Sequence, residues 1–285
     1  MAKLLEGKPL ALKIQEDLRQ QVSSFKNKLI LAAVQVGENA SSRAYVRSQE
    51  KTAESLGIVY QFHQLSADTA ENSLIGLIEK INSDKSINGL IVQMPLPGHI
   101  DYRKIREAIL PQKDVEGVHP QNLGKMILGN SDLIGARIVP CTPASVMELL
   151  SSTGIDLTGK EVVIVGRSVI VGKPLLLLLL EKSATVTVCH SGTSKAGKLE
   201  EHIKRAEVLI VAMGKPEFVK GELIKEGAVV IDVGINQVNE KIVGDVEFEA
   251  AKNRASWITP VPGGVGPLTV TMLMRNLIEA AKLQL

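Results

Sequence analysis

Two glycines enclose a short segment that begins with an arginine and a serine, residue types that suit the binding of a phosphate group. The apolar run Glu161–Val165 is typical of a buried parallel strand, and it stops at Gly166, where a side chain would obstruct close backbone approach. Gly172 then opens a segment of helical length, Lys173–Lys182, which contains six consecutive leucines. A strand, a glycine turn and a helix in this order direct free backbone N–H groups and the positive end of the helix dipole to one point. We therefore predict that the pyrophosphate of a dinucleotide binds here.

The residues around this turn also bear on the choice of dinucleotide. The spacing is not the usual fingerprint, because five residues separate the glycines and Arg167 and Ser168 stand where small residues are usual. The next expected strand, Thr185–Cys189, should end near the adenosine ribose, and His190 and Ser191 follow it in place of an acidic residue. A carboxylate normally binds the 2′-hydroxyl of NAD, whereas Arg167 with Ser168 and Ser191 could hold a 2′-phosphate, so we predict NADP. The alternative is that Arg167 only caps a loop or pairs with a surface carboxylate.

Two series of alternating strands and helices must position these groups, and they predict a two-domain α/β fold. The first series predicts a small parallel α/β domain, with strands at 29–36, 58–65 and 89–94 and helices at 10–28, 42–56, 70–82 and 102–110. The second predicts a Rossmann-like doubly wound sheet, with strands at 161–165, 185–189, 208–212, 228–233 and 257–259 and helices at 144–152, 173–182, 198–205 and 221–225.

The expected domain boundaries follow from the same pattern. Residues 1–140 form the N-terminal domain and residues 141–267 the dinucleotide-binding domain, while the final helix, 268–285, returns to the first domain. The segment 111–140 is rich in Gly, Pro, Asn and Asp, so it is either a linker or a set of ligand loops.

Composition excludes several classes of function. The chain has 285 residues, a net charge of +2 and only 3% aromatic residues, so neither a basic stripe nor a stacking surface for nucleic acid is expected. Two distant cysteines, Cys141 and Cys189, indicate neither a disulfide framework nor a metal site. The N-terminus lacks the features of a signal peptide, and the leucine run is too short to span a bilayer. We expect a cytoplasmic protein that binds small molecules and neither nucleic acid nor membrane.

Several short motifs follow one another in a fixed order along essentially the whole chain. They are residues 44–46 (AYV), 92–97 (VQMPLP), 113–117 (KDVEG), 140–143 (PCTP), 166–168 (GRS), 171–174 (VGKP), 232–236 (DVGIN), 244–246 (GDV) and 259–267 (TPVPGGVGP). The last of these motifs is highly specific. Together they resemble one family, the bifunctional methylenetetrahydrofolate dehydrogenase/methenyltetrahydrofolate cyclohydrolases of one-carbon metabolism.

The resemblance implies a folate cleft between an N-terminal domain and an NADP-binding domain, in a subunit that usually forms a homodimer. In the dehydrogenase step, hydride leaves a carbon flanked by two nitrogens, so placement of that carbon against the nicotinamide is the main task. In the cyclohydrolase step, water attacks the resulting cation and the ring opens, which requires proton transfer by a positioned side chain.

The resemblance also assigns residues. Catalytic roles fall on Tyr45, Gln49 and Gln93, and substrate contacts fall on Tyr45, Gln93, Glu116, Pro262, Gly263 and Gly264. The predicted cofactor-binding residues are Gly166, Arg167, Ser168, His190, Ser191, Ala212, Gly214, Val233, Gly234, Ile235 and Thr269. Most of them follow expected strand ends, where ligands of doubly wound sheets lie. No metal is expected.

Two positions depart from the family pattern. Gln49 stands where the family has a lysine, and Glu116 stands where it has an aspartate. A glutamine can hold a water but cannot act as general acid or base. On a helix that turns about 100° per residue, Gln49 lies about 40° from Tyr45, whereas Arg47 and Lys51 lie about 160° and 120° away, so neither replaces the lysine. The glutamate keeps the carboxylate with one more methylene.

These departures predict an NADP-dependent oxidoreductase with weak or absent cyclohydrolase activity. Three alternatives stay open: a fully bifunctional enzyme with a compensating base, a dehydrogenase of small hydroxy or amino acids, and a non-catalytic dinucleotide-binding regulator. Several of these residues also have a plain structural explanation. Tyr45 could be a half-buried helix residue, the 262–267 loop a rigid turn, and Asp114 and Asp232 helix caps or turn formers.

Overall fold

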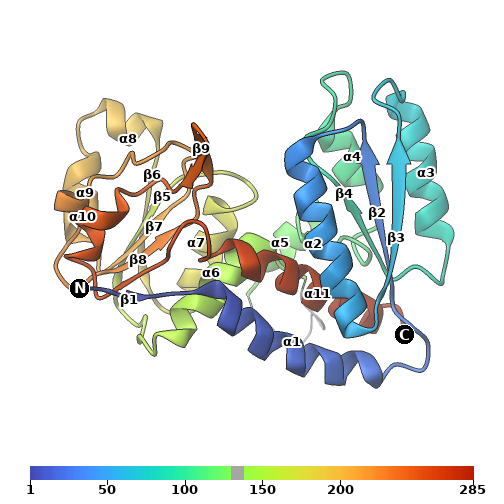
Figure 1. Ribbon diagram of the computed structural model, residues 1–285, viewed down its shortest axis with the longest axis horizontal. Helices are drawn as coiled ribbons and strands as arrows, with labels where there is room; N and C mark the ends of the chain where they lie inside the picture. The colour runs from blue at the N-terminus through green and yellow to red at the C-terminus, as the bar shows by residue number, and fades with distance from the viewer. Residues whose placement is uncertain (130–137) are drawn as a thin grey trace. The chain divides into compact units, whose positions relative to one another are not determined.

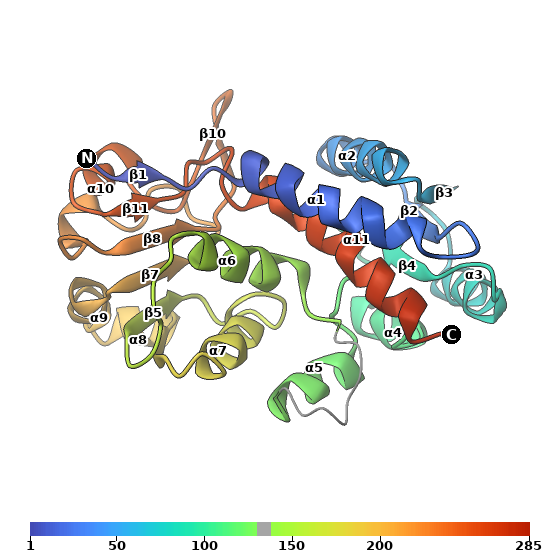
Figure 2. The ribbon, with the colours of Figure 1, turned by 90° about the horizontal axis from the view of Figure 1, so that it is seen from below.

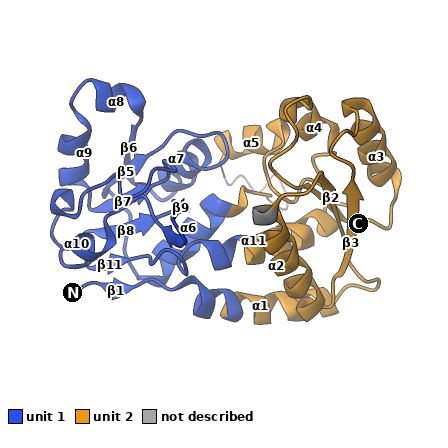
Figure 3. Cartoon of the chain, turned by 45° about the horizontal axis from the view of Figure 1, so that its top comes forward, with its two compact units in different colours: residues 1–12, 142–269 blue, residues 13–141, 270–285 orange. Residues whose placement is uncertain are grey.

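The structure is a computed structural model that describes residues 1–129 and 138–285 (Figure 1). The chain divides into two compact units: unit 1 comprises residues 1–12 and 142–269, and unit 2 comprises residues 13–141 and 270–285 (Figure 3). Each unit combines a parallel sheet with helices, so the predicted α/β class is confirmed. The helices α1 (Gly7–Ser23), α6 (Cys141–Ser152) and α11 (Gly266–Lys282) each have residues in both units.

Unit 2 is built on a three-stranded parallel sheet in the order β3, β2, β4. Its further elements are β2 (Ile30–Val36), α2 (Ala40–Leu56), β3 (Val59–Leu65), α3 (Glu71–Ser83), β4 (Gly89–Val92), α4 (Tyr102–Ala108) and α5 (Pro120–Ile127). Successive side chains of β2 point to opposite faces of the sheet. Leu31 and Ala33 pack in a core with residues of α1, α2 and α11, whereas Ala32 and Val34 pack with residues of α3 and α4. Both faces are covered, which explains why β2 is apolar at every position but one.

Unit 1 contains a six-stranded sheet in the order β1, β11, β8, β7, β5, β6, and all five pairings are parallel. Figure 2 shows β1, β11, β8, β7 and β5 in this order, and Figure 1 labels β6. The sheet strands are β1 (Lys3–Leu4), β5 (Glu161–Val165), β6 (Thr185–Cys189), β7 (Val208–Val211), β8 (Val229–Asp232) and β11 (Trp257–Ile258), and a separate antiparallel hairpin is formed by β9 (Asn236–Val238) and β10 (Lys241–Val243). The helices are α6 (Cys141–Ser152), α7 (Gly172–Leu180), α8 (Ser191–Lys195), α9 (Leu199–Arg205), α10 (Phe248–Lys252) and the 3₁₀ helix η1 (Gly221–Leu223).

The strand order of unit 1 sets where a ligand is expected. The chain runs from β5 outward to the edge strand β6 and then returns to β7 on the other side of β5. The topological switch point therefore lies between the carboxyl ends of β5 and β7, where doubly wound sheets bind their ligands.

Several local expectations differ from the structure. The segment 111–140 contains a helix, α5, which begins at Pro120 with His119 Nδ1 accepting from the Gln121 N–H at 3.0 Å. This cap and the proline at the first helical position favour a helix start that the weak periodicity did not reveal. Residues 130–137 of the same segment lie outside the described residues. The helix expected at 221–225 is only the short 3₁₀ helix η1.

The N-terminal residues also group differently from the expected boundary at residue 140. Lys3 and Leu4 pair with Trp257 and Ile258 of β11, so residues 1–12 group with unit 1 rather than with the rest of the N-terminal segment. Two residues are too few to show the periodicity that predicts a strand. Their pairing partners also lie more than 250 positions further along the chain, so no local signal marks the pairing.

Candidate functional site

The helix α2 and the strands β3 and β4 of unit 2 bring three polar side chains together. Gln49 of α2 is fully buried, and its Oε1 accepts hydrogen bonds from Gln93 Nε2 and from the Tyr60 hydroxyl, both at 2.8 Å. Gln49 Nε2 donates to Gln93 Oε1 at 3.4 Å. Gln93 follows the last residue of β4 and is 4% exposed. Both carboxamides are therefore held in one orientation, with the acceptor of Gln49 used twice.

Tyr45 lies one helical turn before Gln49 on α2. It is half-buried and packs against the core that includes residues of α1 and α11, so its ring fills part of that core while some of the residue stays accessible. Arg47 and Lys51, two basic residues of the same helix, are both exposed. The expectation from helical geometry, that neither would share the direction of Gln49, agrees with this difference in burial.

Tyr60 was not predicted from the sequence. Burial, reinforced by the neighbouring Glu50 and Tyr45, raises the pKa of its hydroxyl, so Tyr60 stays protonated and acts as the donor to Gln49. No spacing rule connects Tyr60 on β3 with Gln49 on α2. Only the paired strands and the covering helix bring them into contact.

The loop that carries Glu116 is anchored by the two residues at its start. Lys113 is 3% exposed and donates through Nζ to the carbonyls of Ile81, Asn82 and Asp84 at 2.6 to 2.9 Å. Asp114, 2% exposed, accepts from the N–H groups of Gly117 and His119 at 3.1 and 2.8 Å and from Asn122 Nδ2 at 2.9 Å. These two side chains therefore hold the loop in place. The hydrogen bonds of Asp114 support its interpretation as a turn former.

Glu116 is partly accessible, although most of its carboxyl is surrounded by protein atoms. Burial, together with the nearby Asp114 carboxylate, raises its pKa to about 8. Burial also raises the pKa of the neighbouring Cys141 thiol, and Glu116 and Asp114 add to that shift. Cys141 is thus a protonated, weakly nucleophilic thiol. Glu116 is the predicted site residue of unit 2 that changes charge near neutral pH.

In unit 1, Gly166 and Gly172 form a turn in which backbone meets backbone. A Cβ at Gly166 would lie 2.4 Å from the Ala212 oxygen, and a Cβ at Gly172 would lie 2.2 Å from the Gly166 oxygen. Gly166 also has φ of +138°, which other residues rarely adopt. The ends of β5 and β7 therefore touch at the switch point, with the first turn of α7 directly beside them.

The side chains predicted to bind the adenosine end are exposed around this turn. Arg167, Ser168 and Ser191 are all exposed. Ser168 Oγ accepts from the Val171 N–H at 3.1 Å, which leaves its hydroxyl hydrogen free to donate to a ligand. His190 is partly buried, and its Nδ1 accepts from the Gly192 N–H at 3.1 Å as the cap of α8.

The remaining predicted cofactor residues follow strand ends or lie in the first turn of α11. Ala212 and Gly214 follow β7, and Val233, Gly234 and Ile235 follow β8, with Ile235 68% exposed. The Thr269 hydroxyl donates to the Gly266 carbonyl at 2.8 Å within α11.

The glycines of the 262–264 loop have a packing explanation in unit 1. Gly264 is buried, and a Cβ there would lie 2.6 Å from the Thr259 Cβ. The Gly7 N–H donates to the Gly263 carbonyl at 2.8 Å, and a Cβ at Gly7 would collide with the Gly264 oxygen. Pro262 is exposed and Gly263 partly so. A ligand could thus meet Pro262 and Gly263, whereas the bare backbone of Gly264 is already used for internal packing.

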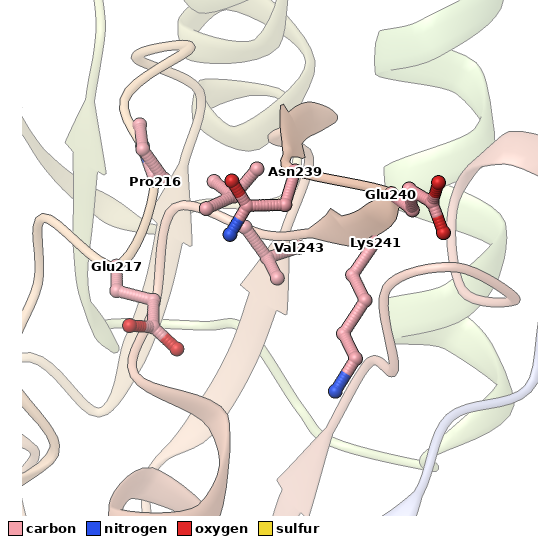
Figure 4. A pocket seen from close by; sticks show the side chains of 7 residues that line it. Pro216, Glu217, Asn239, Glu240, Lys241 and Val243 are labelled. Atoms are coloured by element: carbon pink, nitrogen blue, oxygen red, sulfur yellow. The ribbon is translucent and has the colours of Figure 1, made fainter.

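A surface hollow of about 690 Å³ lies beside the β9–β10 hairpin in unit 1 (Figure 4). Its lining includes Glu217, Asn239, Glu240 and Lys241 and contains none of the predicted site residues. Within residues 1–129 and 138–285, no three His, Cys, Asp or Glu side chains gather as metal ligands would. None of the helices in that same part of the chain has the length and apolarity to cross a membrane.

Comparison with known proteins identifies the family. Residues 5–116 match the family model of the tetrahydrofolate dehydrogenase/cyclohydrolase catalytic domain, and residues 140–285 match the NAD(P)-binding domain of the same family. A curated relative from Acetivibrio thermocellus, named bifunctional protein FolD, is 53% identical, with 99% of this chain and 98% of the relative covered.

Solved structures agree with these matches. The crystal structure of the bifunctional enzyme FolD from Campylobacter jejuni, a methylenetetrahydrofolate dehydrogenase/cyclohydrolase, superposes with a TM-score of 0.94 at 42% identity over 100% of both chains. The Trypanosoma brucei enzyme complexed with NADP cofactor and inhibitor gives a TM-score of 0.91 at 36% identity, covering 99% of this chain and 97% of that one. The expectation of a nicotinamide dinucleotide is thereby confirmed as NAD(P). The chain belongs to the tetrahydrofolate dehydrogenase/cyclohydrolase family.

Proposed function

We propose that this protein is an NADP-dependent methylenetetrahydrofolate dehydrogenase whose cyclohydrolase activity is weak or lost. The observation that carries this proposal is the state of Gln49. The side chain at the position of the family's lysine is fully buried, cannot titrate near neutral pH, and has its acceptor engaged by Tyr60 and Gln93.

The dehydrogenase step asks little acid–base chemistry of the chain. The departing hydride leaves a cation delocalised over two nitrogens, so no protein base is needed and positioning supplies the rate enhancement. Tyr45, with its half-buried ring, and Gln93, locked by Gln49, are the predicted positioning residues of unit 2. Neither role depends on a lysine at position 49.

The nucleotide side of unit 1 fits a dinucleotide. The contacts at Gly166 and Gly172 leave no room for a Cβ, so backbone N–H groups and the start of α7 are presented without side chains between them. When bound, NADP supplies the hydride acceptor. The exposed guanidinium of Arg167 and the hydroxyls of Ser168 and Ser191 would hold its 2′-phosphate.

The cyclohydrolase step needs a group that moves a proton as water attacks and the ring opens. Gln49 cannot do this, and its burial also keeps it from holding a water in the observed arrangement. General acid–base catalysis contributes roughly 10²- to 10⁴-fold, so the loss of the group predicts a fall of that order in hydrolysis.

Two assays on the purified protein test the proposal. Reduction of NADP with methylenetetrahydrofolate measures the first step, and hydrolysis of methenyltetrahydrofolate measures the second. We expect a dehydrogenase with slow hydrolysis, and a Gln49→Lys variant that hydrolyses about 10²-fold faster or more. Brisk hydrolysis by the unmodified protein that Gln49→Lys leaves unchanged would defeat the proposal.

Gln284→Lys is the matched control. Gln284 is a partly buried glutamine of unit 2, and its Nε2 donates to the carbonyls of Asn88, Gln112 and Ala280 at 2.8 to 3.1 Å. The variant places a lysine in the same unit at a site whose hydrogen bonds involve none of Gln49, Gln93 and Tyr60. Any gain in hydrolysis shared by both variants would show that an added lysine acts nonspecifically.

A second candidate function, full bifunctionality, is favoured by one observation. Glu116 has a pKa of about 8, so its carboxyl could exchange a proton near neutral pH. Relatives such as the Acetivibrio thermocellus protein are named bifunctional. If Glu116 compensates for the lysine, hydrolysis by the unmodified protein will be rapid, will follow a titration near pH 8, and will disappear in Glu116→Gln.

The choice of NADP has its own test. Arg167→Ala should raise KM for NADP about tenfold or more and leave KM for NAD nearly unchanged, because only NADP carries the 2′-phosphate. Equal effects on both cofactors would show that Arg167 has a structural role. A homodimer in the cytoplasm remains the expectation that accompanies this function.

A further inference from the structure

A buried carboxylate, that of Asp245, organises the loop that follows β7 in unit 1. Its Oδ2 accepts from the N–H groups of Met213 and Gly214 at 2.5 and 2.9 Å, and its Oδ1 accepts from the Lys215 N–H and from Asn236 Nδ2, both at 2.8 Å. Asp245 is completely buried. Four donors from two segments therefore converge on one carboxylate, as donors converge on an anion in an anion-binding loop.

A second carboxylate fixes the first. Asp232, at the end of β8, accepts from the N–H groups of Gly234, Asp245 and Val246 at 2.8 to 3.0 Å, and it is 4% exposed. The Thr259 hydroxyl, just beyond β11, accepts in turn from the Asp232 N–H at 2.7 Å. The positions of Asp245 and of the loop after β7 thus follow from contacts at the ends of β8 and β11.

The backbone around both carboxylates leaves no space for adjustment. A Cβ at Gly234 would lie 2.2 Å from the carboxyl group of Asp245, and a Cβ at Gly244 would lie 2.0 Å from Asp232 Oδ2. The two glycines allow the loops to close directly on the carboxylates. The arrangement is therefore tightly constrained rather than a loose network.

This arrangement limits what the loop after β7 can offer a ligand. The N–H groups of Met213, Gly214 and Lys215 point to Asp245, so they are not available to bind phosphate. The loop can offer carbonyl oxygens, which accept hydrogen bonds from hydroxyl or carboxamide groups. The loop also begins at Ala212, whose oxygen lies against Gly166 at the switch point.

We propose that Asp245 is a positioning residue for dinucleotide binding, acting through the 213–215 loop, whose carbonyl side meets the ribose or carboxamide donors of the cofactor. The proposal rests on the proposed function. It assigns a role in cofactor binding to a residue that does not itself contact the cofactor. It also gives the two loops different roles: the Gly166–Gly172 turn would bind phosphate, whereas the 213–215 loop would not.

Asp245→Asn tests the role, since it keeps the size of the side chain and replaces one acceptor oxygen with an NH₂ group that faces N–H donors. We expect the Kd for NADP, measured by calorimetry without folate, to rise about tenfold. Hydrogen exchange in a peptide covering residues 212–216 should become faster. Under saturating NADP, the KM for the folate substrate should change less than twofold, which a general loss of structure would not produce.

Glu247→Gln is the matched control, because Glu247 also holds a backbone group in unit 1, the Gly221 N–H at 3.1 Å, but lies outside the 213–215 loop. It should leave the Kd for NADP unchanged. If Asp245→Asn does not fold, Asn236→Ala is tested in its place, because it removes one of the four donors to Asp245. The Kd for NADP should then rise two- to threefold. An unchanged Kd in the variant that folds overturns this proposal alone, whereas no dinucleotide binding by the unmodified protein overturns it together with the proposed function.

Discussion

Replacing Glu116 by glutamine should remove a pH-dependent loss of stability that the native carboxyl causes in unit 2. Burial and the Asp114 carboxylate raise the pKa of Glu116 to about 8, compared with 4.5 for a free glutamate side chain. Between these values the folded protein binds a proton that the unfolded chain has released. The unfolding free energy therefore falls as pH rises through this window.

The magnitude follows from the width of the window. From pH 6 to the pKa of about 8, each pH unit lowers the unfolding free energy by about 1.4 kcal/mol. The full effect between pH 6 and pH 9 would be about 2.7 kcal/mol, and partial exposure of Glu116 reduces it to about 2 kcal/mol. Burial also raises the pKa of Asp114, which interacts with Glu116, so the comparison with Glu116→Gln measures the titration of the coupled pair. Tyr102 and Cys141, which Glu116 also influences, have raised pKa values and stay protonated over this range.

Urea unfolding at pH 6 and pH 9 measures the effect as a difference between the unmodified protein and Glu116→Gln. The variant should gain about 2 kcal/mol relative to the unmodified protein as pH rises, and a ¹³C titration of the Glu116 carboxyl should have its midpoint near pH 8. Glu54→Gln, at an exposed carboxyl of α2, is the control. Parallel pH profiles for Glu116→Gln and the unmodified protein, or a carboxyl midpoint near pH 4.5, would refute the reasoning.

Two further predictions concern residues that hold loops in place. Gly166→Ala should lower the unfolding free energy by about 2 kcal/mol or more and weaken NADP binding, because φ is +138° and the new Cβ would lie 2.4 Å from the Ala212 oxygen; calorimetry and urea unfolding measure both effects. Lys113→Met should lower the unfolding free energy by about 2 to 3 kcal/mol, since three carbonyls lose their charged donor, and an equal stability in urea would argue against a structural role for this lysine.

The fold was largely predictable because hydrophobic periodicity and glycine positions act locally. The strands Glu161–Val165 and Thr185–Cys189 were predicted with their exact bounds, since an apolar run between turn residues leaves little freedom. Strand β1 was not predicted, because its two residues become a strand only through pairing with β11. Local signals cannot carry such long-range information.

The residues of the candidate site also fall into those that local sequence signals predict and those that they do not. The turn at Gly166 could be predicted because its glycines are required by the local backbone. Tyr60 and Asp245 could not be assigned a role, because each acts on a segment at least ten residues away, Tyr60 on Gln49 and Asp245 on the 213–215 loop. A hydrogen bond between distant segments leaves no periodic pattern in the sequence.

The residue type at position 49 also decides which hydrogen bonds Tyr60 and Gln93 can make. Glutamine accepts from the Tyr60 hydroxyl and from Gln93, whereas a lysine has three donors and no acceptor. In Gln49→Lys, Gln93 can turn its amide to present Oε1, but the Tyr60 hydroxyl hydrogen loses its acceptor. An unsatisfied buried donor costs about 1 to 3 kcal/mol.

A double-mutant cycle of Gln49→Lys and Tyr60→Phe should therefore be non-additive. Tyr60→Phe alone should lower the unfolding free energy by about 1 kcal/mol, because it removes one hydrogen bond to Gln49. In the lysine background the same change should raise the unfolding free energy by about 1 to 3 kcal/mol, because it removes a donor that has lost its acceptor. Urea unfolding of the four proteins should therefore give a coupling of about 2 to 4 kcal/mol if Tyr60 depends on the acceptor of Gln49. An equal cost of Tyr60→Phe in both backgrounds would mean that Tyr60 has another partner, and that position 49 can be exchanged without reference to β3.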